Sequence, residues 1–186
     1  VSGTSADAPV LRDGHTYQLL GVQSGKALAA DPASLAIRTS ATTTAGATTQ
    51  AWTVRTLDGA GTDRRRFVLQ NRDGRLLGTS GGGTVLSSAT VEAAASDPSL
   101  QWIASTTDGK TYSLLSVASE QVLDVNGQST ADGASVGLYT SNGGGNQRWT
   151  PADVAVTGVR EVRTATATGV APQLPAQVTL VYAGNV

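Results

Sequence analysis

Four residues between positions 124 and 147 of this 186-residue chain have side chains that together suit a sugar ligand. Asp124 supplies a carboxylate, Tyr139 an aromatic ring, and Asn146 and Gln147 a pair of carboxamides shortly before Trp149. The acid and the amides can hydrogen-bond ring hydroxyls, while an aromatic face can cover the apolar C–H side of a pyranose. These residue types predict a binding function before any catalytic one.

Three repeated units must position these residues. The three tryptophans, Trp52, Trp102 and Trp149, lie 50 and 47 residues apart, a near-constant period that is typical of a repeat architecture. Each follows a glutamine at the end of its unit, and each unit opens with an aromatic residue before aliphatic ones. These opening segments are 15–20, 66–70 and 110–115.

Each unit has the pattern of an all-β structure. Asp-Gly and Asn-Gly pairs recur along the chain, and such pairs adopt the positive φ values of tight hairpins. They begin at Asp13, Asp58, Asp73, Asp108, Asn126, Asp132 and Asn142. Between them, short segments such as 53–55, 67–69 and 113–115 have the length and partial alternation of strands. The alanine-rich run 91–95 has helix propensity, but we expect a strand or loop there because it occupies a strand position of its repeat.

Three related β units that end in Gln-x-Trp resemble the ricin-B-type lectins, or R-type β-trefoils, and the family 13 carbohydrate-binding modules. The resemblance implies a β-trefoil over residues 13–153, with repeats at about 13–57, 58–107 and 108–153. It is strongest in the third repeat and weaker in the second, where Gln101 and Trp102 are adjacent. It also implies that the tryptophans pack in the core around a pseudo-threefold axis, so we do not expect them to be sugar ligands.

The resemblance assigns roles to the residues of the third repeat. Asp124 matches the aspartate that accepts two sugar hydroxyls, Tyr139 matches the stacking aromatic, and Asn146 with Gln147 matches the polar pair at the repeat end. Gln147 is expected both to brace Asp124 and to shape the pocket. Asn142 either adds a contact or only forms a turn.

Two features of the third repeat leave alternatives open. Gly137 replaces a frequent glutamine, so one hydrogen bond is missing or is supplied by water. Asp124 alone could equally be a turn residue bonded to the backbone near Asn126 and Gly127. We favour the ligand role because Tyr139 and Asn146 accompany it.

The first two repeats lack these groups. Aligned leucines place Ala29 and Gly78 at the position of the acid, with the aromatic position near Arg38 in the first repeat and at serines after Leu86 in the second. Alanine and glycine have no side-chain acceptor for a hydroxyl. The sequence predicts one sugar site on a three-unit scaffold.

Composition argues against several other partners. Charged residues make up 15% of the chain and the net charge is −1, which does not favour nucleic acid. The run 64–66 of three arginines has the pattern of a solvated strand edge. No stretch of the sequence is long and apolar enough to cross a bilayer, so we expect no membrane insertion.

Catalysis also has little support. There is no cysteine, which excludes thiolate chemistry and disulfides, and Val122 and Ser141 stand where the resembled family often has cysteines. His15 is the only histidine and has no nucleophile motif to serve. The three glutamates show no pairing pattern, and the glycine runs lack the lysine of a phosphate loop. We expect no catalytic residue, no metal site and no cofactor.

The two ends differ from the centre in composition. Residues 1–12 have the pattern of a linker, and residues 154–186 resemble a linker and the first strands of a bacterial immunoglobulin-like domain. Because the chain lacks methionine and a signal peptide, we expect a piece of a longer, secreted bacterial protein. The leading hypothesis is a non-catalytic carbohydrate-binding module attached to the catalytic domain of an extracellular glycan-degrading enzyme. The alternative is a trefoil scaffold for protein contact or domain packing that has lost sugar binding.

Overall fold

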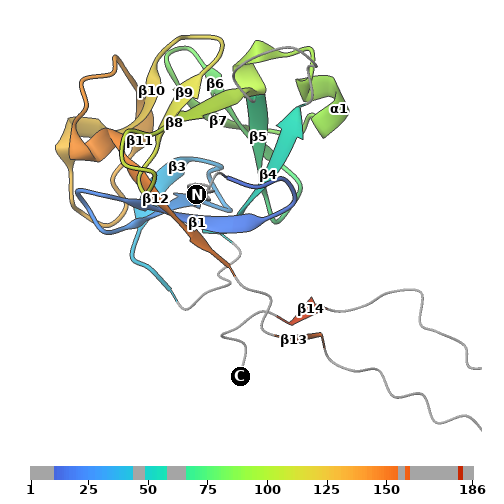
Figure 1. Ribbon diagram of the computed structural model, residues 1–186, viewed down its shortest axis with the longest axis horizontal. Helices are drawn as coiled ribbons and strands as arrows, with labels where there is room; N and C mark the ends of the chain where they lie inside the picture. The colour runs from blue at the N-terminus through green and yellow to red at the C-terminus, as the bar shows by residue number, and fades with distance from the viewer. Residues whose placement is uncertain (1–10, 44–48, 58–65, 155–157, 160–179, 182–186) are drawn as a thin grey trace, which may run out of the picture.

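The computed structural model describes residues 11–43, 49–57, 66–154, 158–159 and 180–181. Their elements form the all-β arrangement in Figure 1. The strands are β1 (Thr16–Gly21), β2 (Ala27–Ala30), β3 (Ile37–Ser40), β4 (Trp52–Leu57), β5 (Arg66–Asn71), β6 (Leu76–Ser80), β7 (Gly83–Ser87), β8 (Trp102–Ser105), β9 (Ser113–Ser116), β10 (Val122–Val125), β11 (Val136–Tyr139), β12 (Trp149–Asp153), β13 (Gly158–Val159) and β14 (Leu180–Val181). The short helices are α1 (Val91–Ala94), η1 (Pro98–Leu100), η2 (Asn126–Gln128) and η3 (Gly145–Gln147).

Six strands form a barrel and six form three hairpins on one side of it. The antiparallel barrel order is β12-β1-β4-β5-β8-β9, and a bridge between Tyr112 and Trp149 closes the ring. The hairpins are β2-β3, β6-β7 and β10-β11, and their outer strands contact one another. This arrangement is the expected β-trefoil.

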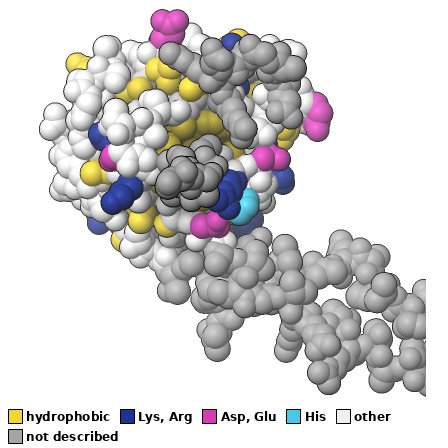
Figure 2. Space-filling model, in the orientation of Figure 1, with side chains coloured by type: hydrophobic (Ala, Val, Ile, Leu, Met, Phe, Trp, Pro, Cys, Tyr) yellow, Lys and Arg dark blue, Asp and Glu magenta, His cyan; other side chains and the backbone are white. Residues whose placement is uncertain are grey.

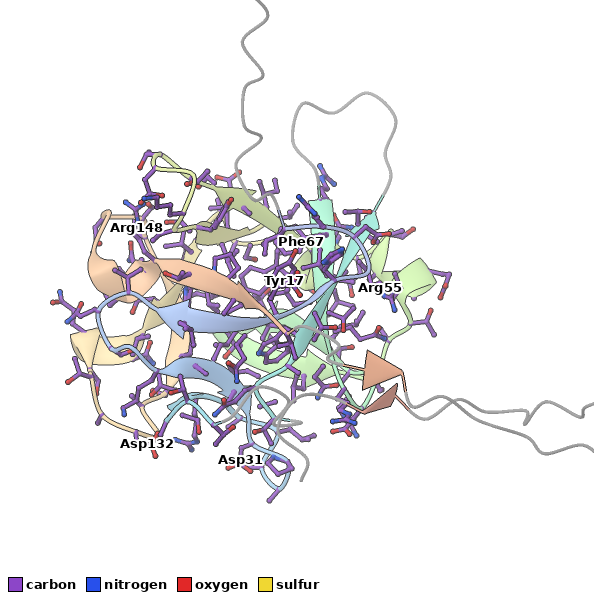
Figure 3. The ribbon with its side chains drawn as sticks, turned by 60° about the horizontal axis from the view of Figure 1, so that its bottom comes forward. Tyr17, Asp31, Arg55, Phe67, Asp132 and Arg148 are labelled. Atoms are coloured by element: carbon purple, nitrogen blue, oxygen red, sulfur yellow. The ribbon has the colours of Figure 1, made fainter. Side chains whose placement is uncertain are left out.

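The core repeats one aromatic arrangement three times. Tyr17 pairs with Trp52, Phe67 with Trp102, and Tyr112 with Trp149, and all six residues are buried. Figure 3 shows Tyr17 and Phe67 in the interior between the barrel strands. The aromatic residues that open each unit and the tryptophans that close it are therefore packing partners.

The indole N–H of each tryptophan makes an equivalent hydrogen bond in its repeat. The Nε1 atoms of Trp52, Trp102 and Trp149 donate to the carbonyls of Leu28, Leu77 and Leu123, at 2.9, 2.8 and 3.3 Å. These leucines precede Ala29, Gly78 and Asp124. The hydrogen bonds thus support the sequence alignment that placed those three residues at equivalent positions.

The glycine of each described Asp-Gly or Asn-Gly pair has the positive φ that the sequence predicts, although the pair at Asn126 lies in η2. The glycines after Asp13, Asp73, Asp108, Asn126, Asp132 and Asn142 all have φ between 63° and 80°. The pair that begins at Asp58 lies outside the described residues. Asp108 also caps its turn, and bonds from the Thr111 and Lys110 backbone N–H groups hold the pKa of its carboxyl below the ordinary value.

The expectation of a strand or loop at residues 91–95 is wrong. Val91–Ala94 form one helical turn, in which the Thr90 hydroxyl accepts from the Ala93 N–H at 3.2 Å. Gln101 donates to the carbonyls of Ala94 and Ala95 at the other end. Alanine propensity and these two caps outweigh the strand position of the run, because the insertion lies outside the barrel ladder.

Several predictions concern residues that lie largely outside the described ones. This applies to most of the linker at residues 1–12, to the arginines 64 and 65, and to most of the immunoglobulin-like segment 154–186. Within that segment, β13 and β14 pair antiparallel. The domain bounds therefore stay predictions. Among the described residues, no helix is long and apolar enough to cross a membrane.

Candidate functional site

The site in the third repeat is built around a buried carboxylate. Asp124 lies on β10, opposite Gly137 of β11, and is only 5% exposed. Its Oδ2 accepts from Asn146 Nδ2 at 2.8 Å and from Gln147 Nε2 at 2.9 Å. Both donors lie on η3, so one helical turn holds the acid from the side. Such bonds to a charged acceptor offset the cost of its burial.

The other oxygen of this carboxylate remains available. Within the described part of the chain, Asp124 Oδ1 accepts no hydrogen bond, yet it is not among the fully buried atoms without a partner. It therefore keeps contact with solvent and can accept hydroxyl donors. The turn alternative does not describe this geometry, because the carboxylate bonds to side chains of η3 instead of the backbone at Asn126 or Gly127.

An aromatic ring borders the acid. Tyr139 ends β11, where it pairs with Val122, two residues before Asp124. It is 59% exposed, and among the described residues only Val22 is also a large exposed hydrophobic side chain. An exposed ring next to a buried acid is what stacking on a sugar requires.

Gln147 has a structural task as well as its bond to Asp124. Its Nε2 donates to the Thr140 carbonyl at 3.1 Å and its Oε1 accepts from the Asn142 N–H at 2.9 Å. In the first repeat, Gln50 makes the equivalent pair of bonds to Ala41 and Thr43 and bonds no acid among the described residues. Gln147 thus braces Asp124 as expected, and its role in shaping a sugar pocket stays a prediction.

Asn142 stabilises the loop between β11 and η3. Its Oδ1 accepts from the Gly144 N–H at 2.8 Å, which is a local turn in the segment between β11 and η3. Of the two roles left open for Asn142, the structure displays the turn.

Two residues of the site were not apparent from the sequence. A Cβ built on Gly137 would lie 3.0 Å from Asn126 Oδ1, so the Asn126 carboxamide packs against the glycine that replaces the frequent glutamine. Asn126 is exposed, and its Nδ2 donates to Ser135 Oγ. The Asn-Gly pair at this position predicts only a turn, and the contact with Gly137 depends on the pairing of β10 with β11.

Gly144 is the second. Asn146 Nδ2 lies between two acceptors, Asp124 Oδ2 and the Val125 carbonyl, which fixes the amide with Oδ1 turned the other way. That Oδ1 is buried and has no partner among the described residues. A Cβ on Gly144 would lie 2.5 Å from it. The glycine run is thus part of the site as well as a turn.

Gly144→Ala should therefore weaken ligand binding. Gly144 has φ −61° and ψ 152°, which alanine adopts without strain, so the effect comes from the added Cβ, which would meet Asn146 Oδ1 at 2.5 Å and Asn142 Oδ1 at 2.9 Å. Displacing Asn146 breaks its bond to Asp124, and we expect roughly a tenfold loss of affinity. Calorimetric titration measures it. Gly83→Ala is the control, because its nearest neighbour would be 3.7 Å away; equal affinity of the two variants would contradict the role of Gly144.

The first repeat has a different lining at the equivalent place. Ala29 pairs with Arg38, and the register puts Ser40, opposite Ala27, at the position of Tyr139. The aromatic position that the sequence placed near Arg38 is thus two residues further on. Ala29 and Ser40 supply neither a carboxylate nor a ring, although Asp132 of the third repeat accepts from the Ala41 N–H beside Ser40.

In the second repeat, side chains fill the place that is equivalent to the Asp124 site. Gly78 lies against η1, where an added Cβ would meet Leu100 Cδ2 at 2.5 Å. Leu100 stands at the position of Gln147 and is 3% exposed. An apolar side chain therefore occupies the space that the amide and carboxylate share in the third repeat.

Among the described residues, the charged side chains outside the third repeat form no comparable cluster. Figure 2 displays one face of mostly uncharged polar surface, with charged side chains of both signs scattered over it. In the described ranges no group of three or more His, Cys, Asp or Glu could hold a metal ion. His15 Nδ1 lies 2.9 Å from Asp153 Oδ2, which joins the first and last barrel strands.

The chain is similar to known proteins in sequence and in fold. Residues 98–171 match the model of the ricin-type beta-trefoil lectin domain-like family. An exo-beta-1,6-galactobiohydrolase of Bifidobacterium longum subsp. longum is 38% identical over 193 residues. That alignment covers 98% of this chain but only 13% of the relative's length.

Two solved structures share the fold. The designed threefold-symmetric protein ThreeFoil has a TM-score of 0.61 and 29% identity, over 74% of this chain and 98% of its own. The Macrolepiota procera ricin B-like lectin, solved in complex with lactose, has a TM-score of 0.60 and 20% identity, over 76% of this chain and 97% of its own. At that identity the lectin is similar in fold alone.

Proposed function

We propose that this chain, which carries a ricin B-type lectin-like domain with the β-trefoil fold, is a non-catalytic carbohydrate-binding module with one sugar site in its third repeat. The observation that carries the proposal is the buried Asp124 carboxylate, which has one oxygen free and the exposed Tyr139 ring beside it. Two hydroxyls of a pyranose can donate to the free oxygen while the ring covers the C–H face.

The sugar class we propose is galactose and its β-linked oligomers. Support comes from the relative, which is named for β-1,6-galactobiose release and is 38% identical along nearly all of this chain. Because the chain spans 13% of that protein, we further propose that it is a module of a larger, secreted glycan-degrading enzyme and holds the catalytic domain near its polymer. The immunoglobulin-like domain after residue 154 stays a prediction.

A glycan array that includes β-1,6-galactan fragments tests the proposal. We expect binding to galactose-containing glycans, and calorimetric titration of a hit should give one site per chain. With a few hydrogen bonds and one stacked ring, Kd should be on the order of 0.1–1 mM, or about −4 to −5.5 kcal/mol. An array without any hit would favour the alternative, a scaffold for protein contact, for which Gly137 and the two blank repeats are the supporting features. A stoichiometry of two or three would contradict the single site.

Tyr139→Ala should weaken sugar binding without unfolding the domain. The ring is mostly solvent-exposed, so its removal costs little stability, while lost stacking costs about 0.5–1.5 kcal/mol, or roughly two- to tenfold in Kd. Tyr139→Phe keeps the ring and should bind nearly as the native chain does. If the phenylalanine variant is as weak as the alanine variant, the hydroxyl and not the ring makes the contact.

A further inference from the structure

A turn of the first repeat lies against the site of the third. The turn follows β1, and in Figures 1 and 3 it lies beside the segment that leads from η3 to Arg148. The Val22 N–H donates to the Arg148 carbonyl at 2.9 Å, and the Gln23 N–H donates to the Gly145 carbonyl at 3.3 Å. Residues from opposite ends of the domain thus form one surface.

The Gln23 side chain joins both short helices that flank Asp124. Its Nε2 donates to the carbonyl of Gln128, the last residue of η2, at 3.0 Å, while its backbone contacts the first residue of η3. Gln128 has φ 54°, a conformation uncommon for a residue with a side chain, and this bond helps hold it. The second amide hydrogen and the Oε1 atom of Gln23 make no other hydrogen bond in the described structure.

Next to Gln23, Val22 is 46% exposed. It and Tyr139 are the two large exposed hydrophobic side chains of the described residues. Val22 adjoins the end of η3, which carries Asn146 and Gln147, and Tyr139 pairs with the start of β10, which carries Asp124. An apolar surface beside a carboxamide with free hydrogen-bonding capacity repeats, on a smaller scale, the chemistry of the Asp124 pocket.

We propose that Val22 and Gln23 form a second subsite, which binds the neighbouring sugar unit of an oligosaccharide whose first unit occupies the Asp124 pocket. The inference rests on the proposed function and narrows it to chains of at least two sugars. Val22 covers apolar C–H groups of the second ring, and the Gln23 carboxamide bonds its hydroxyls. The site of the third repeat is then completed by the first.

The trefoil provides a matched control for Val22. Val117 follows β9 as Val22 follows β1, and its N–H donates to the Gln101 carbonyl at 3.0 Å, one residue before Trp102. The Val22 bond likewise goes to the residue before Trp149. Val117 adjoins the filled site of the second repeat, where Leu100 and Gly78 leave no room for a sugar.

Titration of the native chain with galactose and with β-1,6-galactobiose tests the second subsite. We expect the disaccharide to bind roughly five- to tenfold tighter, since a second ring adds contacts only if the site extends. Val22→Ser should reduce the affinity for galactobiose about threefold or more and leave that for galactose unchanged. Gln23→Ala should lower the ratio of the two affinities, and Val117→Ser should change neither.

Equal affinity of the native chain for the two sugars would overturn the second subsite. So would an equal loss for both sugars in Val22→Ser and Gln23→Ala, because the turn would then only brace the pocket. If the native chain binds neither galactose nor galactobiose, both the second subsite and the proposed galactose specificity fail. The titration with galactose therefore separates failure of the proposed function from failure of the second subsite.

Discussion

Asp124→Ala should abolish detectable sugar binding while the domain stays folded. The change removes the acceptor for two sugar hydroxyls, and each bond to a charged acceptor contributes roughly 1.5–3 kcal/mol. Against a total of about −4 to −5.5 kcal/mol, that loss brings the affinity below the range of titration. Array binding and calorimetry measure it.

The fold should tolerate this change because the amides that bond Asp124 have other partners. Asn146 Nδ2 also contacts the Val125 carbonyl, and Gln147 Nε2 also donates to the Thr140 carbonyl. Asp132→Ala is the matched control, since this acid lies in the same repeat and accepts from the Ala41 N–H. Normal binding by Asp124→Ala, or unfolding of that variant, would show that the acid is structural.

Trp102→Ala should have the largest effect on stability. The side chain is completely buried, it packs against Phe67, and its indole donates to the Leu77 carbonyl. Truncation of a buried tryptophan lowers the free energy of unfolding by about 3–5 kcal/mol through lost contacts and the cavity left behind. Denaturant titration followed by circular dichroism measures the change.

Trp102 suits this test because it belongs to the second repeat, in which no sugar site is predicted. Trp102→Phe keeps most of the buried volume and should cost less than the alanine variant. A change of under about 1 kcal/mol in Trp102→Ala would contradict the role of the tryptophans as the packing centre of each repeat.

The trefoil was predictable because its core aromatic residues recur at nearly regular intervals in the sequence. One aromatic opens each unit and one tryptophan closes it, and the pairing of Tyr17 with Trp52 recurs in the other repeats. Glycines with positive φ mark the connections of two of the three hairpins, at Gly81 and Gly82 between β6 and β7 and at Gly127 and Gly133 between β10 and β11. Asp124, Tyr139, Asn146 and Gln147 were predicted from the resemblance of the third repeat. The structure brings the first, third and fourth of them together, and their role toward a sugar stays a prediction.

What the sequence did not predict depends on contacts between distant segments or on unequal loops. The helix at Val91–Ala94 forms because its caps are satisfied in the long segment between β7 and β8. The register of the first hairpin moved the aromatic position from Arg38 to Ser40. Asn126 beside Gly137, and Gln23 beside Gln128, meet only after the hairpins and the barrel have formed.

The single sugar site in the third repeat is tested most directly by a titration of the isotope-labelled chain with galactose, followed by two-dimensional amide NMR. We predict chemical-shift changes at Asp124, Tyr139 and Asn146 and their neighbours, with one common Kd. Amides around Ala29 and Gly78 should not move. Saturable shifts at either of those two positions, or none near Asp124 when galactose binds, would contradict the account.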